Sequence, residues 1–269
     1  DPLRRQRQMC IRDSHKTAIV EPGAKIAEDV EIGAYSVIDK HVSIGSGTRI
    51  GNHSVITGKT VIGKNNRIFH HVSLGEQPQD KKYDGEETTL EIGDDNVIRE
   101  FCSFNTGTIQ DKVKTVVGDR NWIMAYVHIA HDCVVRDDTI LANCAQLAGH
   151  VEVGDFAMLG GFSGIHQFCR IGAHALTGVG SVVLSDVPPY VTCSGDAAKP
   201  HGINAEGMKR RGYLPDQIKI IRDAYKVLYR SSLTLNDAKV EISRMAKESP
   251  DLIVLSEFLS STSGRSIIR

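Results

Sequence analysis

Histidine, carboxylate and glycine residues recur at one interval in the second half of this 269-residue chain. His131, Gly149 and Gln167 lie 18 positions apart, and Asp132 lies 18 positions before His150. Histidine, with an ordinary pKa of about 6.5, can take up a proton near neutral pH or bind a metal. Glycine lets a ligand approach the backbone closely. These residues can act together only if the fold brings such positions next to each other.

A repeat of six residues explains the interval. From Val117 to Val183, every sixth residue is a branched aliphatic except Thr177. This period matches neither an α-helix nor a single strand. It is typical of hexapeptide repeats, in which the chain winds as a triangular parallel β-helix with the aliphatics pointing to the axis. Three hexads make one coil, so residues a coil apart stack at the strand spacing of about 4.8 Å.

The repeat therefore predicts a cluster at one edge of the prism. His131, Gly149 and Gln167 stack there, Asp132 stacks on His150, and His166 precedes Gln167 in the chain. A single surface histidine on such a prism carries little information, but a stacked set of polar residues favours a functional site.

The phase of the hexapeptide repeat divides the chain into three parts. We expect a disordered or non-native extension over residues 1–14, a hexapeptide-repeat prism over 15–190, and a connection with a helical domain over 191–269. The repeat is interrupted near 75–91 and 105–116, which predicts two loops that leave the prism. Such loops on a rigid scaffold often carry binding residues.

Two local signals complete the expected architecture. Glycine often follows the aliphatic of a hexad, as in Ile44-Gly45, which predicts corners with a positive φ. Helical spacing begins at Pro215, and Thr234 and Pro250 mark the starts of two further helices.

Composition excludes several classes of function. The net charge is −1 with 24% charged residues, so the basic surface needed for nucleic acid is absent. No apolar run approaches the ~20 residues of a membrane span. The six cysteines form no CxxC pair, which favours a reduced, cytoplasmic protein.

Several motifs resemble the bacterial UDP-N-acetylglucosamine O-acyltransferase family over residues 15–269. They are HIAHDC at 128–133, LAGHV at 147–151, HQFCRIGAH at 166–174, DVPPY at 186–190 and NAEGMKRRG at 204–212. The resemblance implies a homotrimer of left-handed parallel β-helices, each with a C-terminal helical domain. It also implies the first step of lipid A synthesis, in which an (R)-3-hydroxyacyl chain moves from acyl carrier protein to the 3-hydroxyl of UDP-N-acetylglucosamine. No metal or cofactor is expected beyond the carrier's phosphopantetheine.

The resemblance also assigns roles to residues. His131 would be the general base, Asp132 would orient it, and the Gly149 N–H would receive the oxyanion. Val179 would limit the length of the acyl chain. The positions expected around the sugar and the thioester are Asp80, Lys82, His128, His150, His166 and Gln167. Those expected at the nucleotide and diphosphate are Asn204, Glu206, Arg210 and Arg211. His166, like His174, is equally suited to packing between subunits.

Four alternatives remain open from the sequence. One is another hexapeptide-repeat acyltransferase, either a UDP-sugar N-acyltransferase or an acetyl-CoA-dependent enzyme. A second is a zinc carbonic anhydrase on the same prism, with His131, His150 and His166 as ligands. A third is a non-catalytic scaffold, which leaves the loop of Asp80 and the Arg210–Arg211 pair without a purpose. The acceptor could also be the 3-amino analogue of UDP-N-acetylglucosamine.

Overall fold

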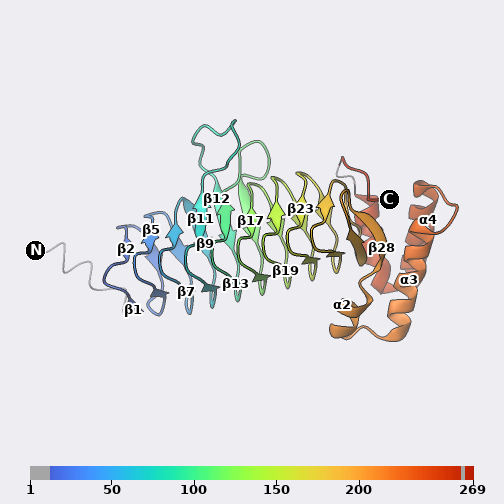
Figure 1. The fold of residues 1–269 in the computed structure, drawn as a ribbon, viewed down its shortest axis with the longest axis horizontal. Coiled ribbons are helices and arrows are strands. Elements are labelled where there is room, and N and C mark those ends of the chain that lie inside the picture. The colour runs from blue at the N-terminus through green and yellow to red at the C-terminus, as the bar shows by residue number, and fades with distance from the viewer. Residues whose placement is uncertain (1–12, 262–263) are drawn as a thin grey trace, which may run out of the picture.

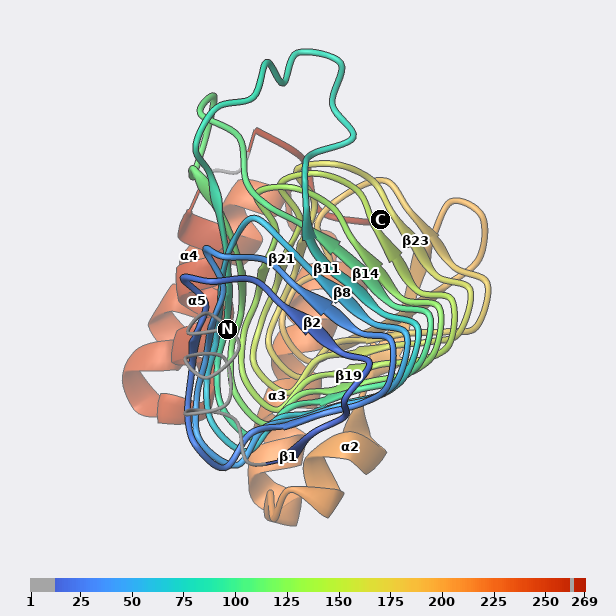
Figure 2. The same ribbon diagram turned by 90° about the vertical axis from the view of Figure 1, so that its left-hand side faces the viewer.

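The chain winds into a long triangular prism that ends in a group of helices (Figure 1). The computed structural model describes residues 13–261 and 264–269. Most of the expected N-terminal extension, residues 1–12, lies outside the described residues. Viewed along its axis, the prism has three flat sides and three corners (Figure 2).

Each side of the prism is one parallel sheet, except that sheet A ends in the antiparallel strand β28. Sheet A consists of β1 (Asp13–Ser14), β4 (Glu31–Ile32), β7 (Arg49–Ile50), β10 (Arg67–Ile68), β13 (Val97–Ile98), β16 (Trp122–Ile123), β19 (Ile140–Leu141), β22 (Met158–Leu159), β25 (Leu176–Thr177), β27 (Val191–Ser194) and β28 (Lys199–Ile203). Sheet B consists of β2 (Ile19–Val20), β5 (Val37–Ile38), β8 (Val55–Ile56), β11 (Ser73–Glu76), β14 (Ser103–Asn105), β17 (His128–Ile129), β20 (Gln146–Leu147), β23 (Gly164–Ile165) and β26 (Val182–Val183). Sheet C consists of β3 (Lys25–Ile26), β6 (Ser43–Ile44), β9 (Lys59–Ile62), β12 (Thr89–Ile92), β15 (Lys114–Val117), β18 (Val134–Val135), β21 (Glu152–Val153) and β24 (Arg170–Ile171).

The register confirms the predicted stacking. Ile129 pairs with Leu147, and Leu147 pairs with Ile165, so one coil is 18 residues long there. These inward side chains are almost completely buried and form the core. Thr177, the one polar member of the series, is 1% exposed, and its hydroxyl lies 2.9 Å from that of Ser163. The core therefore accepts this polar group because it is hydrogen-bonded.

Three sets of turns join the sheets. The turns from sheet B to sheet C form the histidine corner, residues 130–133, 148–151 and 166–169. The turns from sheet C to sheet A form the aspartate corner, residues 118–121, 136–139, 154–157 and 172–175. The turns from sheet A to sheet B form the third corner, which includes residues 124–127, 142–145, 160–163 and 178–181.

The expectation of positive φ at the hexad glycines is wrong. The left-handed residue is the third of the turn and is usually not glycine, as at His53 (φ 55°) and Asp132 (φ 59°). Glycine at the first position serves close approach between coils. A Cβ on Gly51, for example, would lie 2.5 Å from the backbone nitrogen of His70.

The element boundaries correct three expectations. Asp13 and Ser14 pair with β4, so the prism begins inside the segment expected to be an extension. The two loops are shorter than expected, because β11, β12, β14 and β15 continue into them and leave residues 77–88 and 106–113 outside. At the other end, β27 and β28 extend sheet A to Ile203, beyond the expected limit at residue 190.

Helices cover the end of the prism. They are α2 (Ala205–Arg210), α3 (Pro215–Tyr229), α4 (Leu235–Glu248), the 3₁₀ turn η1 (Pro250–Leu252) and α5 (Ile253–Ser260). Thr234 caps α4 as predicted, because its hydroxyl accepts the Asp237 N–H at 3.2 Å. The helix α2 was not predicted, since helical spacing was expected to begin only at Pro215. Among the described residues, no helix is both long and apolar enough to cross a membrane.

Candidate active site

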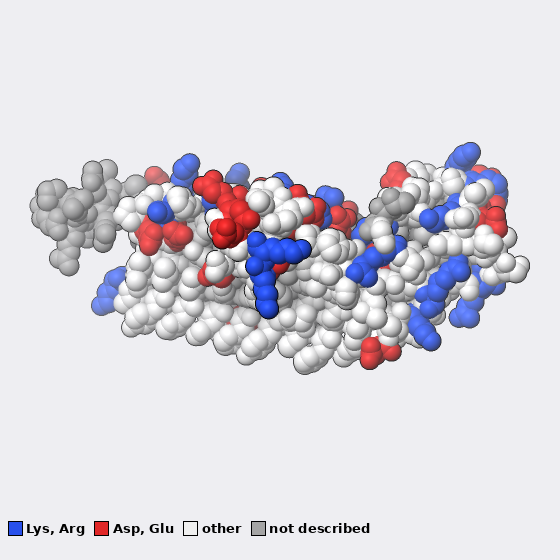
Figure 3. All heavy atoms as spheres, turned by 90° about the horizontal axis from the view of Figure 1, so that it is seen from above, with Lys and Arg blue, Asp and Glu red and all other residues white. Residues whose placement is uncertain are grey.

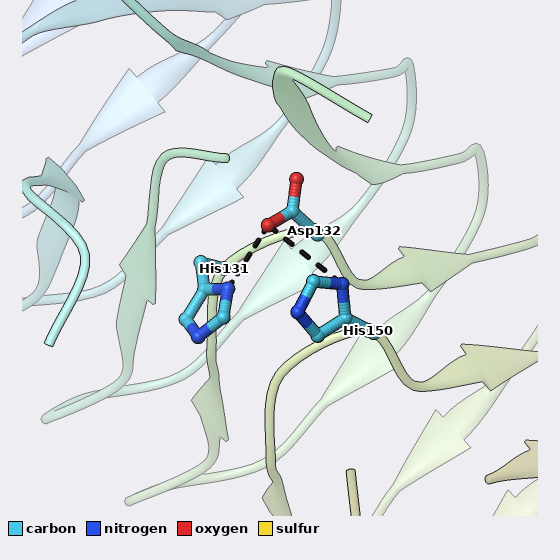
Figure 4. A group of neighbouring side chains, drawn as sticks. All are labelled: His131, Asp132 and His150. Atoms are coloured by element: carbon cyan, nitrogen blue, oxygen red, sulfur yellow. Dashed lines mark hydrogen bonds and ion pairs between the residues drawn. The ribbon is translucent and has the colours of Figure 1, made fainter. Parts of the chain in front are cut away.

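Part of the predicted cluster forms at the histidine corner, where His131, Asp132 and His150 lie together (Figure 4). The loop of residues 106–113 contacts them through Thr108 and Asp111. His131 and Asp132 are consecutive in one turn, and His150 follows one coil later. The His150 N–H donates to the His131 carbonyl at 3.0 Å, which ties the two turns together. The prism therefore places both imidazoles on one edge without help from the loops.

Asp132 is the best-anchored residue of the site. Its side chain is 0% exposed, and its Oδ2 lies 2.9 Å from Nδ1 of His131. Thr108 donates its N–H (3.0 Å) and its hydroxyl (2.6 Å) to the same carboxylate. Burial raises the pKa of Asp132, but the hydrogen bonds from His131 and Thr108 outweigh burial and hold the pKa below its ordinary value. The carboxylate is thus ionised and acts only as an acceptor.

The pairing sets the orientation of His131. Because an ionised carboxylate can only accept, Nδ1 of His131 carries the proton, and Nε2 of the neutral ring is the free acceptor. The His131 side chain is 14% exposed, so solvent or substrate can reach it. The arrangement is that of a general base held by a carboxylate.

Gly149 lies directly against the His131 ring. A Cβ at this position would lie 2.5 Å from Cε1 and 2.7 Å from Nε2 of His131. Within residues 13–261 and 264–269, the Gly149 N–H has no hydrogen-bond partner, although the residue is buried. A free N–H beside a base can receive a developing oxyanion.

His150 completes the cluster through contacts that the sequence only partly predicted. Its ring meets the His131 ring edge-on at 4.9 Å and stacks on Phe168 at 4.2 Å. Its Nδ1 lies 2.7 Å from Oδ2 of Asp111 and 3.9 Å from Oδ2 of Asp132. Phe168 lies 18 positions after His150, so the coil length could have identified it. Asp111 belongs to a loop outside the repeat, and no sequence signal pointed to it.

The three-histidine zinc site is not assembled. In the described part of the chain, His131, Asp132 and His150 offer ligand atoms within 4.8 Å of one another, but His166 does not join them. Instead, Nδ1 of His166 lies 2.8 Å from Nη2 of Arg265. Asp132 is already engaged by Thr108, which disfavours a metal at this place.

The other predicted residues near the site have different surroundings. His128 points outward from β17, and its Nδ1 lies 2.8 Å from the hydroxyl of Ser103. Burial lowers the pKa of His128, and the Ser103 contact opposes this only in part. Gln167 is exposed on the same corner as His166. Asp80 and Lys82 lie in the loop of residues 77–88, where Oδ1 of Asp80 accepts the Lys82 N–H at 3.0 Å, and no hydrogen bond of the described residues joins them to His131.

The four residues expected at the nucleotide lie elsewhere, near the aspartate corner. Arg211 stacks on Phe156, with Cζ 4.3 Å from the ring centre, and donates to the Asp138 carbonyl at 3.2 Å. Burial lowers its pKa. Asn204 is buried, accepts the Gly207 N–H and donates to the His174 carbonyl, so it holds α2 in place.

Arg210 and Glu206 form an exposed ion pair at 3.2 Å on α2. The structure thus brings Asn204, Glu206, Arg210 and Arg211 together, but not to the histidine corner of the same chain.

Val179 occupies the third corner and is 78% exposed. Between it and the histidine corner lies the outer face of sheet B. The first residue of each strand of this sheet is uncharged, and Glu76 at the end of β11 is the one exposed charge within these strands. The first residues are Ile19, Val37, Val55, Ser73, Ser103, His128, Gln146, Gly164 and Val182. Figure 3 shows charged side chains gathered along one side of the prism and a broad side almost without them. A Cβ on Gly164 would meet nothing within 4 Å, so the face is open at this position.

Known proteins resemble both parts of the chain. A family model described as "Udp N-acetylglucosamine O-acyltransferase; Domain 2" matches residues 186–268, and one described as "Bacterial transferase hexapeptide (six repeats)" matches 23–58 and 114–149. The chain is 60% identical to the acyl-[acyl-carrier-protein]–UDP-N-acetylglucosamine O-acyltransferase of Thiobacillus denitrificans, over 95% of this chain and 98% of the relative. It is 55% identical to the protein of the same name from Herminiimonas arsenicoxydans, over the same shares.

Solved structures agree in fold. LpxA from Acinetobacter baumannii is 47% identical, with a TM-score of 0.91 over 95% of this chain and 99% of that one. UDP-N-acetylglucosamine acyltransferase from Francisella novicida is 43% identical, with a TM-score of 0.93 over 95% and 94%. These likenesses confirm the expected fold class, a left-handed parallel β-helix with a C-terminal helical part.

Proposed function

The chain belongs to the UDP-N-acetylglucosamine O-acyltransferase family, and from this premise we propose that it transfers an acyl chain from acyl carrier protein to UDP-N-acetylglucosamine in lipid A synthesis. The observation that carries the proposal is the His131–Asp132 pair lying against Gly149. A base, its orienting carboxylate and a free N–H are the parts that acyl transfer to a hydroxyl requires.

The residues suggest the following steps. Nε2 of His131 takes the proton from the 3-hydroxyl of the sugar as its oxygen attacks the thioester carbonyl of an (R)-3-hydroxyacyl chain. The Gly149 N–H receives the carbonyl oxygen as it becomes negative. Asp132 stabilises the imidazolium that forms. The intermediate then expels the phosphopantetheine thiolate, which takes up the proton held by His131, so the products are the ester and a thiol.

We assign the remaining residues to binding. His128 stays neutral because burial lowers its pKa, so it can hydrogen-bond the substrate without a charge. His150, His166, Gln167, Asp80 and Lys82 surround the sugar and the thioester in this proposal. Glu206, Arg210 and Arg211 bind the nucleotide and diphosphate, with arginine suited to phosphate oxygens. Asn204 acts indirectly, because its amide already holds α2.

The distribution of these residues supports a homotrimer. Arg211 and His131 lie at different corners of one prism, so a site that contains both needs a second copy. The uncharged face of sheet B suits burial against that copy. Mixing His131→Ala with Arg211→Ala subunits tests the idea. The mixture is assayed at a UDP-N-acetylglucosamine concentration far below the raised KM of Arg211→Ala, where both variants are impaired. Mixed trimers should then be more active than either variant alone if each site combines two chains, and no more active than the average of the two if each chain holds a whole site.

We place the protein in the cytoplasm and propose no cofactor beyond the carrier's phosphopantetheine. The free thiols of Cys102, Cys133, Cys144, Cys169 and Cys193 suit a reducing compartment. Burial raises the pKa of Cys133 to about 12, so this thiol stays protonated and takes no part in the transfer.

Val179 is our candidate for limiting the acyl chain. It stands across the uncharged face of sheet B from His131, where a second subunit would supply the other wall of a groove. A branched side chain at the end of such a groove disfavours an over-long chain by about 1–3 kcal/mol, or about 5- to 150-fold. We therefore expect chains of about ten to twelve carbons to be preferred over about fourteen, and Val179→Gly to move the preference upward. Competition among the three acyl carrier proteins measures this, and an unchanged preference for fourteen removes Val179 from the role.

Mass spectrometry tests the function itself. Incubation with 3-hydroxyacyl carrier protein should add the mass of the acyl group to UDP-N-acetylglucosamine, and His131→Ala should abolish the shift. Acetyl-CoA as donor and the 3-amino sugar as acceptor are the comparison reactions. A faster reaction with either one would overturn the proposal in favour of another hexapeptide-repeat acyltransferase.

A further inference from the structure

The loop of residues 106–113 brings a second carboxylate to the histidine corner. Oδ2 of Asp111 lies 2.7 Å from Nδ1 of His150, closer than the 2.9 Å between Asp132 and His131. The side chain of His150 is 11% exposed and that of Asp111 is 37% exposed. The contact therefore covers one edge of a nearly buried imidazole and does not join two free surface groups.

The ring of His150 has one face and one edge already occupied. Phe168 stacks on it at 4.2 Å, and its Nδ1 edge faces Asp111 with Asp132 further away at 3.9 Å. Figure 4 shows the other ring nitrogen, Nε2, turned toward the side on which His131 lies. Since a carboxylate at Nδ1 accepts a proton from the ring, the neutral ring has its free lone pair on Nε2.

We propose that Asp111 is a positioning residue for the transfer reaction, and that Asp111 and His150 form a second carboxylate–imidazole pair beside His131–Asp132. Asp111 holds His150 in the tautomer whose Nε2 accepts a hydrogen bond from a substrate hydroxyl. This inference rests on the proposed function for its substrate, a hydroxylated sugar. The tautomer of His150, in contrast, can be measured in the protein without any substrate.

The loop is attached to the prism independently of Asp111, which allows the two roles to be separated. Thr108 donates two hydrogen bonds to Asp132, and Nζ of Lys112 lies 2.9 Å from Oε1 of Glu152 on β21. Removing the carboxylate of Asp111 therefore leaves the loop fastened on both sides. Gln110, an exposed neighbour, has no hydrogen bond among the described residues and provides a control within the same loop.

The experiment compares four variants in the full-length protein: Asp111→Ala, Asp111→Asn, Lys112→Ala and Gln110→Ala. We expect Asp111→Ala to raise KM for UDP-N-acetylglucosamine about tenfold with little change in kcat, since it loses a hydrogen bond to a charged group. Asp111→Asn keeps an oxygen that accepts the Nδ1 proton, so KM should return to within about threefold of the parent value. Gln110→Ala should match the parent.

A spectroscopic measurement separates tautomer control from loop attachment. The protein is labelled with ¹⁵N-histidine and measured at about pH 8.5, roughly two units above the ordinary histidine pKa. His150, identified by its loss in His150→Gln, should show a protonated Nδ1 and an unprotonated Nε2 in the parent, in Asp111→Asn and in Lys112→Ala. Asp111→Ala should shift both signals toward the other tautomer.

Three results would overturn the proposal. These are a normal KM in Asp111→Ala, equal defects in Asp111→Ala and Asp111→Asn, and His150 signals that do not respond to Asp111→Ala. Failure of the proposed function looks different, because the parent protein would then transfer no acyl group while the signals of His150 still report its tautomer.

Discussion

The histidine corner and the aspartate corner are built on the same turn, but only the aspartate corner has a run of carboxylates that accept backbone N–H groups from the coil before. At the aspartate corner, the Asp119 N–H donates to Oδ1 of Asp137 at 2.9 Å, and the Asp137 N–H donates to Oδ1 of Asp155 at 3.0 Å. At the histidine corner, Gly149 holds the equivalent position, and no partner for its N–H exists among the described residues. The two turns have the same backbone. Only the aspartate corner has a side-chain oxygen one coil later that accepts this N–H.

This comparison shows how a regular scaffold acquires a reactive site. At the aspartate corner, four successive turns donate the N–H of their second residue to a carboxylate oxygen one coil later, from Lys64, Asp94, Asp119 and Asp137. The third corner has one comparable bond, from the Ala34 N–H to Oδ1 of Asn52 at 2.8 Å. At the histidine corner the N–H of Gly149 stays available, and the imidazole of His131 fills the space where a side chain on Gly149 would lie. The site thus lies at a corner that lacks the carboxylate ladder of the aspartate corner.

The first and largest test removes one residue from each corner. We expect His131→Ala to lower kcat by about 10²–10⁴-fold, the usual effect of losing a general base. Asp137→Ala at the aspartate corner should keep full activity, because it removes only a hydrogen-bond acceptor and a partner of Arg120 at 3.1 Å. Steady-state assays and thermal midpoints of both variants measure this. Comparable turnover in the two variants would remove His131 from catalysis.

A second test fills the space beside the turns. Gly149→Ala places a methyl group 2.5 Å from Cε1 of His131, so the ring must move, and misplacement by about 1 Å can cost about 10²-fold in rate. Gly154→Ala at the aspartate corner places a Cβ 2.6 Å from the backbone nitrogen of Ala173, which cannot yield easily. We expect this variant to lose about 1–3 kcal/mol of stability and to keep its activity.

Gly149→Ala should mainly lower the rate, whereas Gly154→Ala should mainly lower the free energy of unfolding. Parallel measurement of kcat and of chemical denaturation decides this. If Gly149→Ala is mainly unstable and Gly154→Ala mainly inactive, the division of roles between the corners is wrong.

The sequence predicted the prism and much of the cluster because one number, the coil length, determines which residues stack. His131, Gly149 and His150 follow from it directly. The Asp111 and Thr108 contacts could not be predicted, since they come from a loop that leaves the repeat, and periodicity says nothing about where such a loop returns.

The contacts of the aspartate corner were harder to predict from the sequence than those of the histidine corner. Arg211 was assigned from family resemblance, but its contact with Phe156 joins a helical segment to a coil more than 50 positions earlier, and no period links the two. A short helix such as α2 has no periodicity to mark it in the sequence, and it depends on a single cap at Asn204.

A third test uses pH and the buried imidazole of the aspartate corner. His174 stacks between Phe156 and Tyr190, and burial together with Arg211 lowers its pKa to about 4 from 6.5. A group with a lowered pKa contributes stability above its unfolded pKa, and this is lost as pH falls through the folded value. Between pH 6.5 and pH 4, the free energy of unfolding falls by on the order of 3 kcal/mol.

We therefore expect the thermal midpoint to fall as the pH is lowered from 6.5 toward 4. His174→Phe keeps a stacked ring and cannot titrate, so it should flatten this part of the profile. Calorimetry at several pH values compares the two proteins. An equally steep profile in the variant would show that other groups control acid stability.

The smallest expected effect concerns Arg211, which tests whether the aspartate corner also serves the reaction. Arg211 is held against Phe156 at 4.3 Å, whereas Arg210 pairs with Glu206 and its side chain is 75% exposed. We expect Arg211→Ala to raise KM for UDP-N-acetylglucosamine about tenfold and to change kcat less, the pattern of binding shared by ground and transition states. Arg210→Ala should act in the same direction but more weakly, because an exposed arginine is less well positioned. Arg244→Ala, which breaks only the α4 pairs with Glu241 and Glu248, is the control. If Arg211→Ala lowers kcat instead, the residue acts on the transition state, and the aspartate corner belongs to the catalytic machinery as much as the histidine corner does.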